Sequence, residues 1–198
     1  MKIMRCQVLC VLAFAAQVFF WHQAEALAAE HVITYGQARH LSVKMEKQGE
    51  WIAHEKGSAF GVLLDSGKEA VFLVNQRKVG SGRFKGEKLN LSWKDRPRFT
   101  EVRFTPEKIK VTVRDGETPW EIKFRKDKVK VVRDGKEYGS IKFYPENGKL
   151  KAKNAGGDEI AVLRNAGGLS GAFAPFLVEG LDEEGRNLLI LLFFALDR

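Results

Sequence analysis

Cysteine is almost absent from this chain. Two occur among its 198 residues, and both, Cys6 and Cys10, lie near its start. The remainder of the chain can therefore form no internal disulfide and offers no thiol nucleophile. Lipid attachment at either cysteine is disfavoured as well. Lipoprotein processing requires a small residue directly before the cysteine, and Arg5 and Leu9 occupy those places.

Motifs for catalysis and metal binding are also lacking. Beyond the N-terminal segment the histidines are His31, His40 and His54, whose spacing matches no pattern of metal ligands. Ser58 and Ser170 lack the Gly-x-Ser-x-Gly context of a hydrolase nucleophile and are interpreted as loop residues. We therefore expect no catalytic residues, no metal site and no cofactor. A hydrolase that uses an unrecognised site is left as an open alternative.

The glycine-rich stretch VGSGRFKG, residues 79–86, is interpreted as a loop between strands. Its glycines could free backbone N–H groups to hold an anion, but a phosphate cradle of this kind is followed by a helix. No helical pattern follows here, so a loop is favoured over a phosphate site.

Residues 1–26 have the layout of a secretory signal peptide. Basic residues open the segment, an apolar stretch runs from Val8 to Trp21, and small residues follow at alternate positions. We expect cleavage after Ala26, with cleavage after Ala28 as the alternative. An uncleaved membrane anchor is disfavoured, because the stretch is shorter than the about 20 apolar residues that cross a bilayer. Residues 27–198 then form one periplasmic or secreted domain without a transmembrane span.

A repeat of 20 and then 19 residues runs through the chain from Lys88 onward, and it aligns Val102 with Ile122 and Ile141. Polar and apolar residues alternate within each half of a unit, which is typical of serial antiparallel β-hairpins. Asp-Gly or Asn-Gly dipeptides take positive φ at little cost, as tight hairpin loops require. They begin at Asp115, Asp134 and Asn147. Together with the hairpin expected around residues 66–67 and weaker candidates upstream, the pattern predicts a mainly β domain of about 10 to 12 strands.

The C-terminal segment, residues 182–198, is predicted to be a buried helix. Asp182 is a good N-cap, and nine consecutive apolar residues run from Leu188 to Leu196. A helix that is apolar all round must be surrounded by protein or lipid. Nine residues cover about 13.5 Å, under half of the about 30 Å of a bilayer core. We therefore expect the hairpins to wrap around this helix as a barrel or a strongly curved sheet, with residues 169–180 as a short packed segment before it.

These features resemble the tubby C-terminal-like fold, which tubby domains, phospholipid scramblases and LURP-one-related proteins share. The resemblance covers residues 88–198. It is carried by the serial strands with Asp-Gly turns, the hairpin GSIKFYPENGKLKAK at Gly139 to Lys153, and the apolar C-terminal helix. It implies a β-barrel of about a dozen strands threaded by that helix. The chain is also similar to uncharacterised secreted bacterial proteins built on the same hairpins.

Positive charge is concentrated in the repeat. The formal net charge of the chain is +8, and residues 108–153 contain 14 basic and 7 acidic residues. The rest of the predicted mature chain is neutral. Seven lysines of neighbouring hairpins are assigned to the outer face and interpreted as a candidate anion- or lipid-binding set: Lys108, Lys110, Lys123, Lys128, Lys130, Lys149 and Lys151.

Two functions are compatible with these patterns. The first is a non-enzymatic exported β-barrel whose basic face binds an anionic lipid headgroup, lipopolysaccharide or an acidic polymer such as a polysaccharide. The second is a structural or assembly module that docks a periplasmic protein partner through its hairpin edges or the apolar segment Phe173–Val178. A lysine face that only keeps strands solvated is the alternative to both. Nucleic acid is disfavoured as a partner because of the predicted export.

Overall fold

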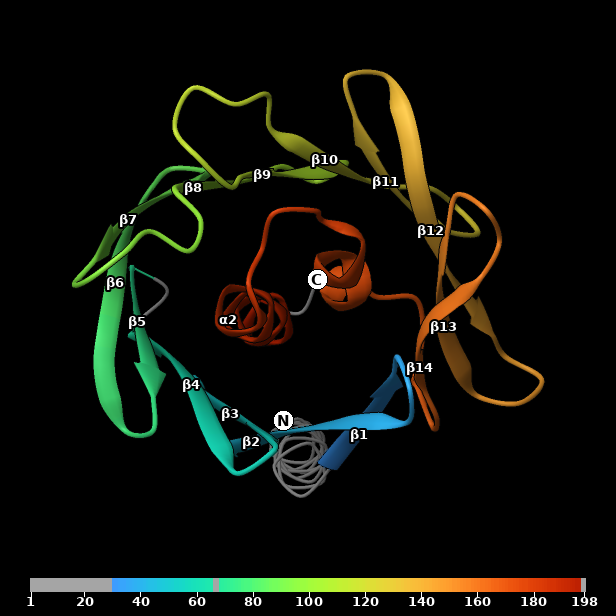
Figure 1. The fold of residues 1–198 in the computed structure, drawn as a ribbon, viewed down its shortest axis with the longest axis horizontal. Coiled ribbons are helices and arrows are strands. Elements are labelled where there is room, and N and C mark those ends of the chain that lie inside the picture. The colour runs from blue at the N-terminus through green and yellow to red at the C-terminus, as the bar shows by residue number, and fades with distance from the viewer. Residues whose placement is uncertain (1–29, 66–67, 197–198) are drawn as a thin grey trace, which may run out of the picture.

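The strands of this chain close into a barrel. The computed structural model describes residues 30–65 and 68–196, so the predicted signal peptide lies outside the described residues. Within them, 14 antiparallel strands pair in chain order, and β1 (Glu30–Tyr35) pairs with β14 (Glu159–Leu163) to complete the ring (Figure 1). The predicted barrel is confirmed. Its strand number is higher than the about 10 to 12 expected from the hairpin pattern.

The elements between β1 and β14 are β2 (Arg39–Lys47), β3 (Glu50–Glu55), β4 (Ser58–Asp65), β5 (Glu69–Val74), β6 (Arg77–Lys85), β7 (Lys88–Trp93), β8 (Glu101–Phe104), β9 (Lys108–Thr112), β10 (Trp120–Phe124), β11 (Val129–Arg133), β12 (Lys136–Tyr144) and β13 (Lys149–Asn154). A 3-10 segment, η1 (Gly171–Leu177), and a helix, α2 (Glu183–Ala195), follow β14.

Left-handed residues occur in the connections where the dipeptides predict turns, and one of the three dipeptides, Asp134-Gly135, forms a tight two-residue turn. Asp134 and Gly135, which join β11 to β12, have φ of 50° and 77°. Two consecutive positive φ values are the requirement of a type I′ turn, whose twist matches that of the flanking strands. Gly116 and Gly148 also have positive φ, in the connections that follow β9 and β12.

The stretch expected to be a glycine-rich loop is instead a strand. Its residues form most of β6, and Gly86 lies in the turn that follows. Gly80 is paired with Trp93 of β7, and a Cβ atom on Gly80 would lie 2.5 Å from the indole ring. Glycine in a strand often marks such a close approach, and here it gives room to a large side chain. Ser58, another expected loop residue, lies in β4, so strands replace two predicted loops.

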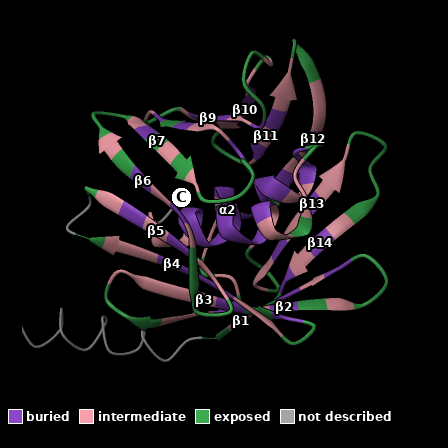
Figure 2. Cartoon of the chain, turned by 60° about the vertical axis from the view of Figure 1, so that its left-hand side comes forward, coloured by how far each residue is buried: buried purple, intermediate pink, exposed green. Residues whose placement is uncertain are grey.

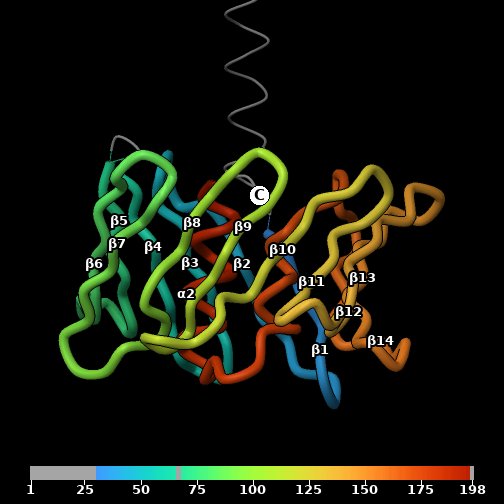
Figure 3. Tube along the Cα trace, turned by 90° about the horizontal axis from the view of Figure 1, so that it is seen from above, coloured from blue at the N-terminus to red at the C-terminus, as the bar shows by residue number. Residues whose placement is uncertain are grey.

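An apolar helix fills part of the interior, as the sequence predicts. α2 begins after Asp182, whose carboxylate caps the helix by accepting a hydrogen bond from the Gly185 backbone N–H at 2.7 Å. All residues from Leu188 to Phe193 are fully buried, and α2 lies inside the ring of strands (Figures 2 and 3). Each large apolar side chain contributes about 1.5 to 3 kcal/mol on burial, so α2 supplies much of the core energy. Among the described residues no helix is long and apolar enough to cross a membrane.

The segment η1 shares the interior with α2. Ser170 precedes it and accepts a hydrogen bond from the Ala172 backbone N–H at 3.1 Å. η1 lies against β10 to β14, whereas α2 lies against β3 and β4, so the two occupy different sides of the barrel (Figure 1). Most of Phe173–Val178 is buried as a result. This segment is therefore core, and it does not form the exposed docking surface that was the alternative expectation.

A buried polar network joins α2 to the first three strands. The carboxylate of Glu55 in β3 is buried and accepts hydrogen bonds from Tyr35 of β1 and Arg39 of β2. It also accepts hydrogen bonds from two residues of α2, from Asn187 Nδ2 at 2.7 Å and from Arg186 at 3.3 Å. Because buried polar groups must be paired to be tolerated, this network fixes the N-terminal end of α2 in the barrel.

Candidate functional site

The outer face of β9 to β13 carries the lysines that the sequence analysis selected. Ile109 and Val111 of β9 are fully buried, while Lys108 and Lys110 alternate with them on the outside. The division of the repeat into an apolar inner face and a basic outer face is thus confirmed. The sheet register then decides which of these outer side chains meet.

Antiparallel pairing places lysines of neighbouring strands opposite one another. Lys123 of β10 is paired with Lys108 of β9 and with Lys130 of β11. Ser140 of β12 is paired with Lys130 and with Lys153 of β13. We call the four lysines, Lys108, Lys123, Lys130 and Lys153, the lysine row. Ser140 lies between Lys130 and Lys153. With neighbouring strands about 4.8 Å apart, the row extends about 19 Å across the outer face.

Glu121 balances one end of the lysine row. Its carboxylate oxygens lie 2.7 Å from Lys123 Nζ, 3.0 Å from Lys108 Nζ and 3.3 Å from Lys110 Nζ. Hydrogen bonds from Lys123 and Lys108 lower the pKa of Glu121 from its ordinary 4.5 to about 2. The carboxylate is therefore ionised at neutral pH, yet it faces three ammonium groups, and this end of the row keeps an excess of positive charge.

Two more of the selected lysines have acidic partners. Lys130 pairs with Glu137 at 2.6 Å and Lys151 pairs with Glu159 at 2.7 Å. Lys128, which precedes β11, and Lys149, at the start of β13, have no ion pair within residues 30–65 and 68–196. The seven selected lysines therefore divide into five that hold a glutamate and two that do not.

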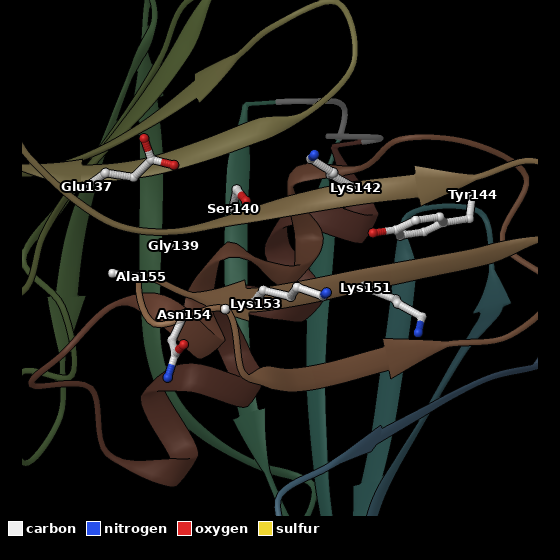
Figure 4. Close-up of a pocket in the computed structure, with 10 residues that line it drawn as sticks. Glu137, Gly139, Ser140, Lys142, Tyr144, Lys151, Lys153, Asn154 and Ala155 are labelled. Atoms are coloured by element: carbon white, nitrogen blue, oxygen red, sulfur yellow. The ribbon is translucent and has the colours of Figure 1, made fainter.

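The outer face is hollowed along β12 and β13. A cavity of about 370 Å³ lies there, with Lys142 and Tyr144 of β12 on one side and Lys151 and Lys153 of β13 on the other (Figure 4). Ser140 also lines it. Its volume falls in the range of small-molecule sites, although its lining is more polar than theirs usually is.

Several polar groups in this cavity are available to a ligand. Lys142 Nζ, Lys153 Nζ and the hydroxyls of Ser140 and Tyr144 make no hydrogen bond or ion pair within the described part of the chain. Asn154 differs, because its amide exchanges two hydrogen bonds of 2.9 Å with Asp158 in the turn after β13. The cavity thus combines free cations and free hydroxyls on an ordered hairpin.

Lys142, Lys153 and Ser140 were not among the selected residues, although a signal for them exists. Lys142 alternates with buried Ile141, and Lys153 follows buried Ala152, so both belong to the outer face. The hairpin pairs Tyr144 with Lys149, Lys142 with Lys151 and Ser140 with Lys153. A four-residue connection at residues 145–148 sets this register, which alternation within single strands does not reveal.

Two other hollows lie on the barrel. One of about 180 Å³ adjoins the first at Lys151 and is lined also by Lys149, Glu159 and Arg164. The other, of about 380 Å³, lies near the end of α2 and is mostly apolar, with Phe84 among its lining residues. The basic hollows therefore lie together over β12 to β14 and β1, while the apolar one lies elsewhere.

The histidines stand apart from this face. His31 stacks on Phe194 of α2 at 5.4 Å between ring centroids, and burial lowers its pKa. His40 lies 3.3 Å from the Thr34 hydroxyl. Among the described residues no group of three histidine, cysteine, aspartate or glutamate side chains could hold a metal ion.

Comparisons with known proteins identify no relative of this chain. No protein-family model, no curated protein and no solved structure matches this chain. The resemblance to the tubby C-terminal-like fold therefore stays a prediction, and function must be argued from the barrel and its outer face.

Proposed function

We propose that this protein is a non-enzymatic, exported binding protein whose lysine-rich outer face binds an anionic surface or ligand, such as lipid headgroups, lipopolysaccharide or an acidic polymer. The lysine row carries this proposal. Opposite charges stabilise cross-strand pairs, and like charges opposite one another destabilise them. Lys123 stands opposite both Lys108 and Lys130, and Glu121 and Glu137 offset only part of this charge. The row therefore keeps an excess of positive charge that an anionic partner would neutralise.

The competing role as a docking module for a protein has less support. Closure of the barrel pairs every described strand on both sides, so no hairpin edge is free to add a strand. The apolar segment Phe173–Val178 lies in the core. Both surfaces on which that role depended are thus occupied within the chain itself.

Electrostatic attraction of this kind has a predictable size. A lysine near an anionic membrane surface contributes about 1 kcal/mol, so three lysines correspond to about 3 kcal/mol, or about 100-fold in affinity. The attraction also depends on salt, because the Debye length falls from about 10 Å at 0.1 M to about 3 Å at 1 M.

Co-sedimentation with vesicles tests the proposal. We expect the protein to bind vesicles that contain phosphatidylglycerol, not to bind vesicles of pure phosphatidylcholine, and to be released from the anionic vesicles at 1 M salt. The triple variant K108Q/K123Q/K130Q should bind about 100-fold more weakly. A matched control, K68Q/K78Q/K85Q, removes three exposed lysines around β5 and β6 and should bind far more tightly than the row variant. Absence of binding to anionic vesicles, binding indifferent to salt, or equal losses in the two variants would contradict the proposal.

A further inference from the structure

We propose that the cavity between β12 and β13 binds one tetrahedral oxyanion, the phosphoryl group of a phosphate monoester. The inference rests on the proposed function, because it names the chemical group that the basic face recognises. Of the lysine row, this site uses only Lys153. The inference and the proposed function can therefore fail separately.

The sheet register sets four donor residues at the corners of a rectangle. Ser140 and Lys142 lie on the outer face of β12, opposite Lys153 and Lys151 of β13. Such positions are about 4.8 Å apart across the strands and about 6.7 Å apart along them. Ser140, Lys142 and Lys153 line the hollow (Figure 4), while the Lys151 ammonium is directed toward Glu159 of β14. A tetrahedral anion there has one oxygen for each of these three donors and a fourth for Lys151 once it turns from Glu159.

The charge of the cavity matches a dianion. Lys142, Lys151 and Lys153 bring three positive charges, and Glu159 neutralises that of Lys151 through its 2.7 Å ion pair. Glu137, which also lines the cavity, is itself held by Lys130. The two remaining charges equal those of a phosphate monoester, which carries about −1.5 to −2 at pH 7. A carboxylate carries one charge and two oxygens, and it would leave part of the site unmatched.

Three of the four donors are free before a ligand binds. Lys142, Lys153 and the Ser140 hydroxyl have no partner in the described residues, so a phosphoryl group would not have to displace an existing ion pair at these three. Lys142 lies directly opposite Lys151, whose charge Glu159 offsets, so Lys142 and Lys153 carry the uncompensated charge of the cavity. Lys151 also lies over the ring of Tyr144, at 5.7 Å from its centroid, which keeps both side chains near the cavity.

The cavity has room for more than the phosphoryl group. Its volume of about 370 Å³ lies in the range of sites that enclose small organic ligands. The free hydroxyl of Tyr144 and the turn residues Ala155 and Gly157 line the remaining space. We therefore assign this space to the first atoms of the esterified alcohol, such as a glycerol or a sugar.

Titration of the full chain with glycerol 3-phosphate, followed by calorimetry at constant ionic strength, tests the inference. We expect saturable binding of glycerol 3-phosphate and of inorganic phosphate, no binding of glycerol, and clearly weaker binding of acetate. Charge-assisted hydrogen bonds to one lysine correspond to about tenfold in affinity, so K142Q/K153Q should lose about 100-fold. The control K68Q/K78Q removes equal charge around β5 and β6, outside both the cavity and the lysine row, and should stay within about threefold of wild type. Thermal melts of both variants check that they are folded.

Vesicles distinguish a lipid source of the phosphoryl group from a soluble one. If the group belongs to a lipid headgroup, K142Q/K153Q loses binding to phosphatidic acid, a monoester, more than to phosphatidylglycerol, a diester. If the phosphoryl group belongs to a soluble ester, the variant loses its binding of glycerol 3-phosphate and keeps its binding to vesicles. Either outcome supports the site. Equal affinity of wild type and K142Q/K153Q for glycerol 3-phosphate, or no saturable binding by wild type, overturns the inference, and the vesicle result with K108Q/K123Q/K130Q still decides the proposed function.

Discussion

Replacement of Glu55 by alanine tests whether the polar network holds the helix in the barrel. Glu55 is 2% exposed, and its carboxylate accepts hydrogen bonds from β1, β2 and α2. The substitution leaves Arg186 and Asn187 inside the barrel without their carboxylate acceptor. Burial lowers the pKa of Arg186 while the charge of Glu55 opposes this shift, so the guanidinium depends on that acidic partner.

The expected loss follows from the burial of this network. Removal of one partner from a buried ion pair costs about 3 to 5 kcal/mol, because the other charge remains uncompensated. For a domain of this size, about 1 kcal/mol corresponds to about 2 to 4 °C in Tm. We therefore expect Glu55→Ala to lower Tm by about 6 to 20 °C. Glu55→Gln keeps an acceptor for Asn187 and should fall between wild type and Glu55→Ala.

Urea unfolding followed by tryptophan fluorescence measures the effect, because Trp51, Trp93 and Trp120 lie in the barrel wall. Glu183→Gln is the matched control. Glu183 also pairs with Arg39, but its side chain is 43% exposed. Loss of such a pair costs about 0 to 1 kcal/mol. Equal losses for Glu55→Ala and Glu183→Gln, or a loss below about 1 kcal/mol for Glu55→Ala, would refute the reasoning that the network anchors α2.

Two further predictions concern the core and the lysine row. Leu191→Ala, in the fully buried part of α2, should lower the free energy of unfolding by about 2 to 5 kcal/mol, whereas Val32→Ala, at a residue 44% exposed, should change it by about 0.5 kcal/mol at most. A similar small effect of both in urea unfolding would argue against a helix in the core. Glu121, whose pKa is lowered to about 2, contributes stability that is fully present above its ordinary pKa of 4.5 and is lost as the pH falls towards 2. The stability difference between wild type and Glu121→Gln should therefore shrink over this range of pH, and a difference independent of pH would exclude ionised Glu121 as its source.

The strands of the repeat were predictable because their signals are local. Alternation in β9 and β13, the Asp-Gly turns and the apolar run of α2 each depend on a few consecutive residues, and the structure confirms them. Residues 79–86, most of which lie in β6, were predicted as a loop because the stretch is rich in glycine and no helical pattern follows it. Gly80 and Gly82 leave room for bulky side chains of β7, namely Trp93, Leu89 and Leu91, which lie against their backbones. Packing between strands therefore accounts for part of the difference in strand number.

The candidate site, too, was only partly predictable from the sequence. The charge pattern selected Lys151, but it did not select Lys142, Lys153 or Ser140, which line the same cavity. Each residue is placed on the outer face by alternation alone. Which residues share one cavity depends on the cross-strand register. Glu121 reaches the lysines of β9, and Glu159 reaches Lys151 of β13, only through that register.

The sequence alone determines which repeated segments are strands and which face of each strand points inward. It also determines that the C-terminal segment is an apolar helix that must be enclosed. These properties arise from the period of two in strands and from the lack of any polar face on the helix. Tertiary structure alone decides the closure of the ring, where Ile33 of β1 meets Leu163 of β14, and the alignment of lysines across β9 to β13. The physical reason is that alternation sets the face of a side chain but not its neighbour on the next strand, which turn lengths, bulges and the fit around α2 settle together.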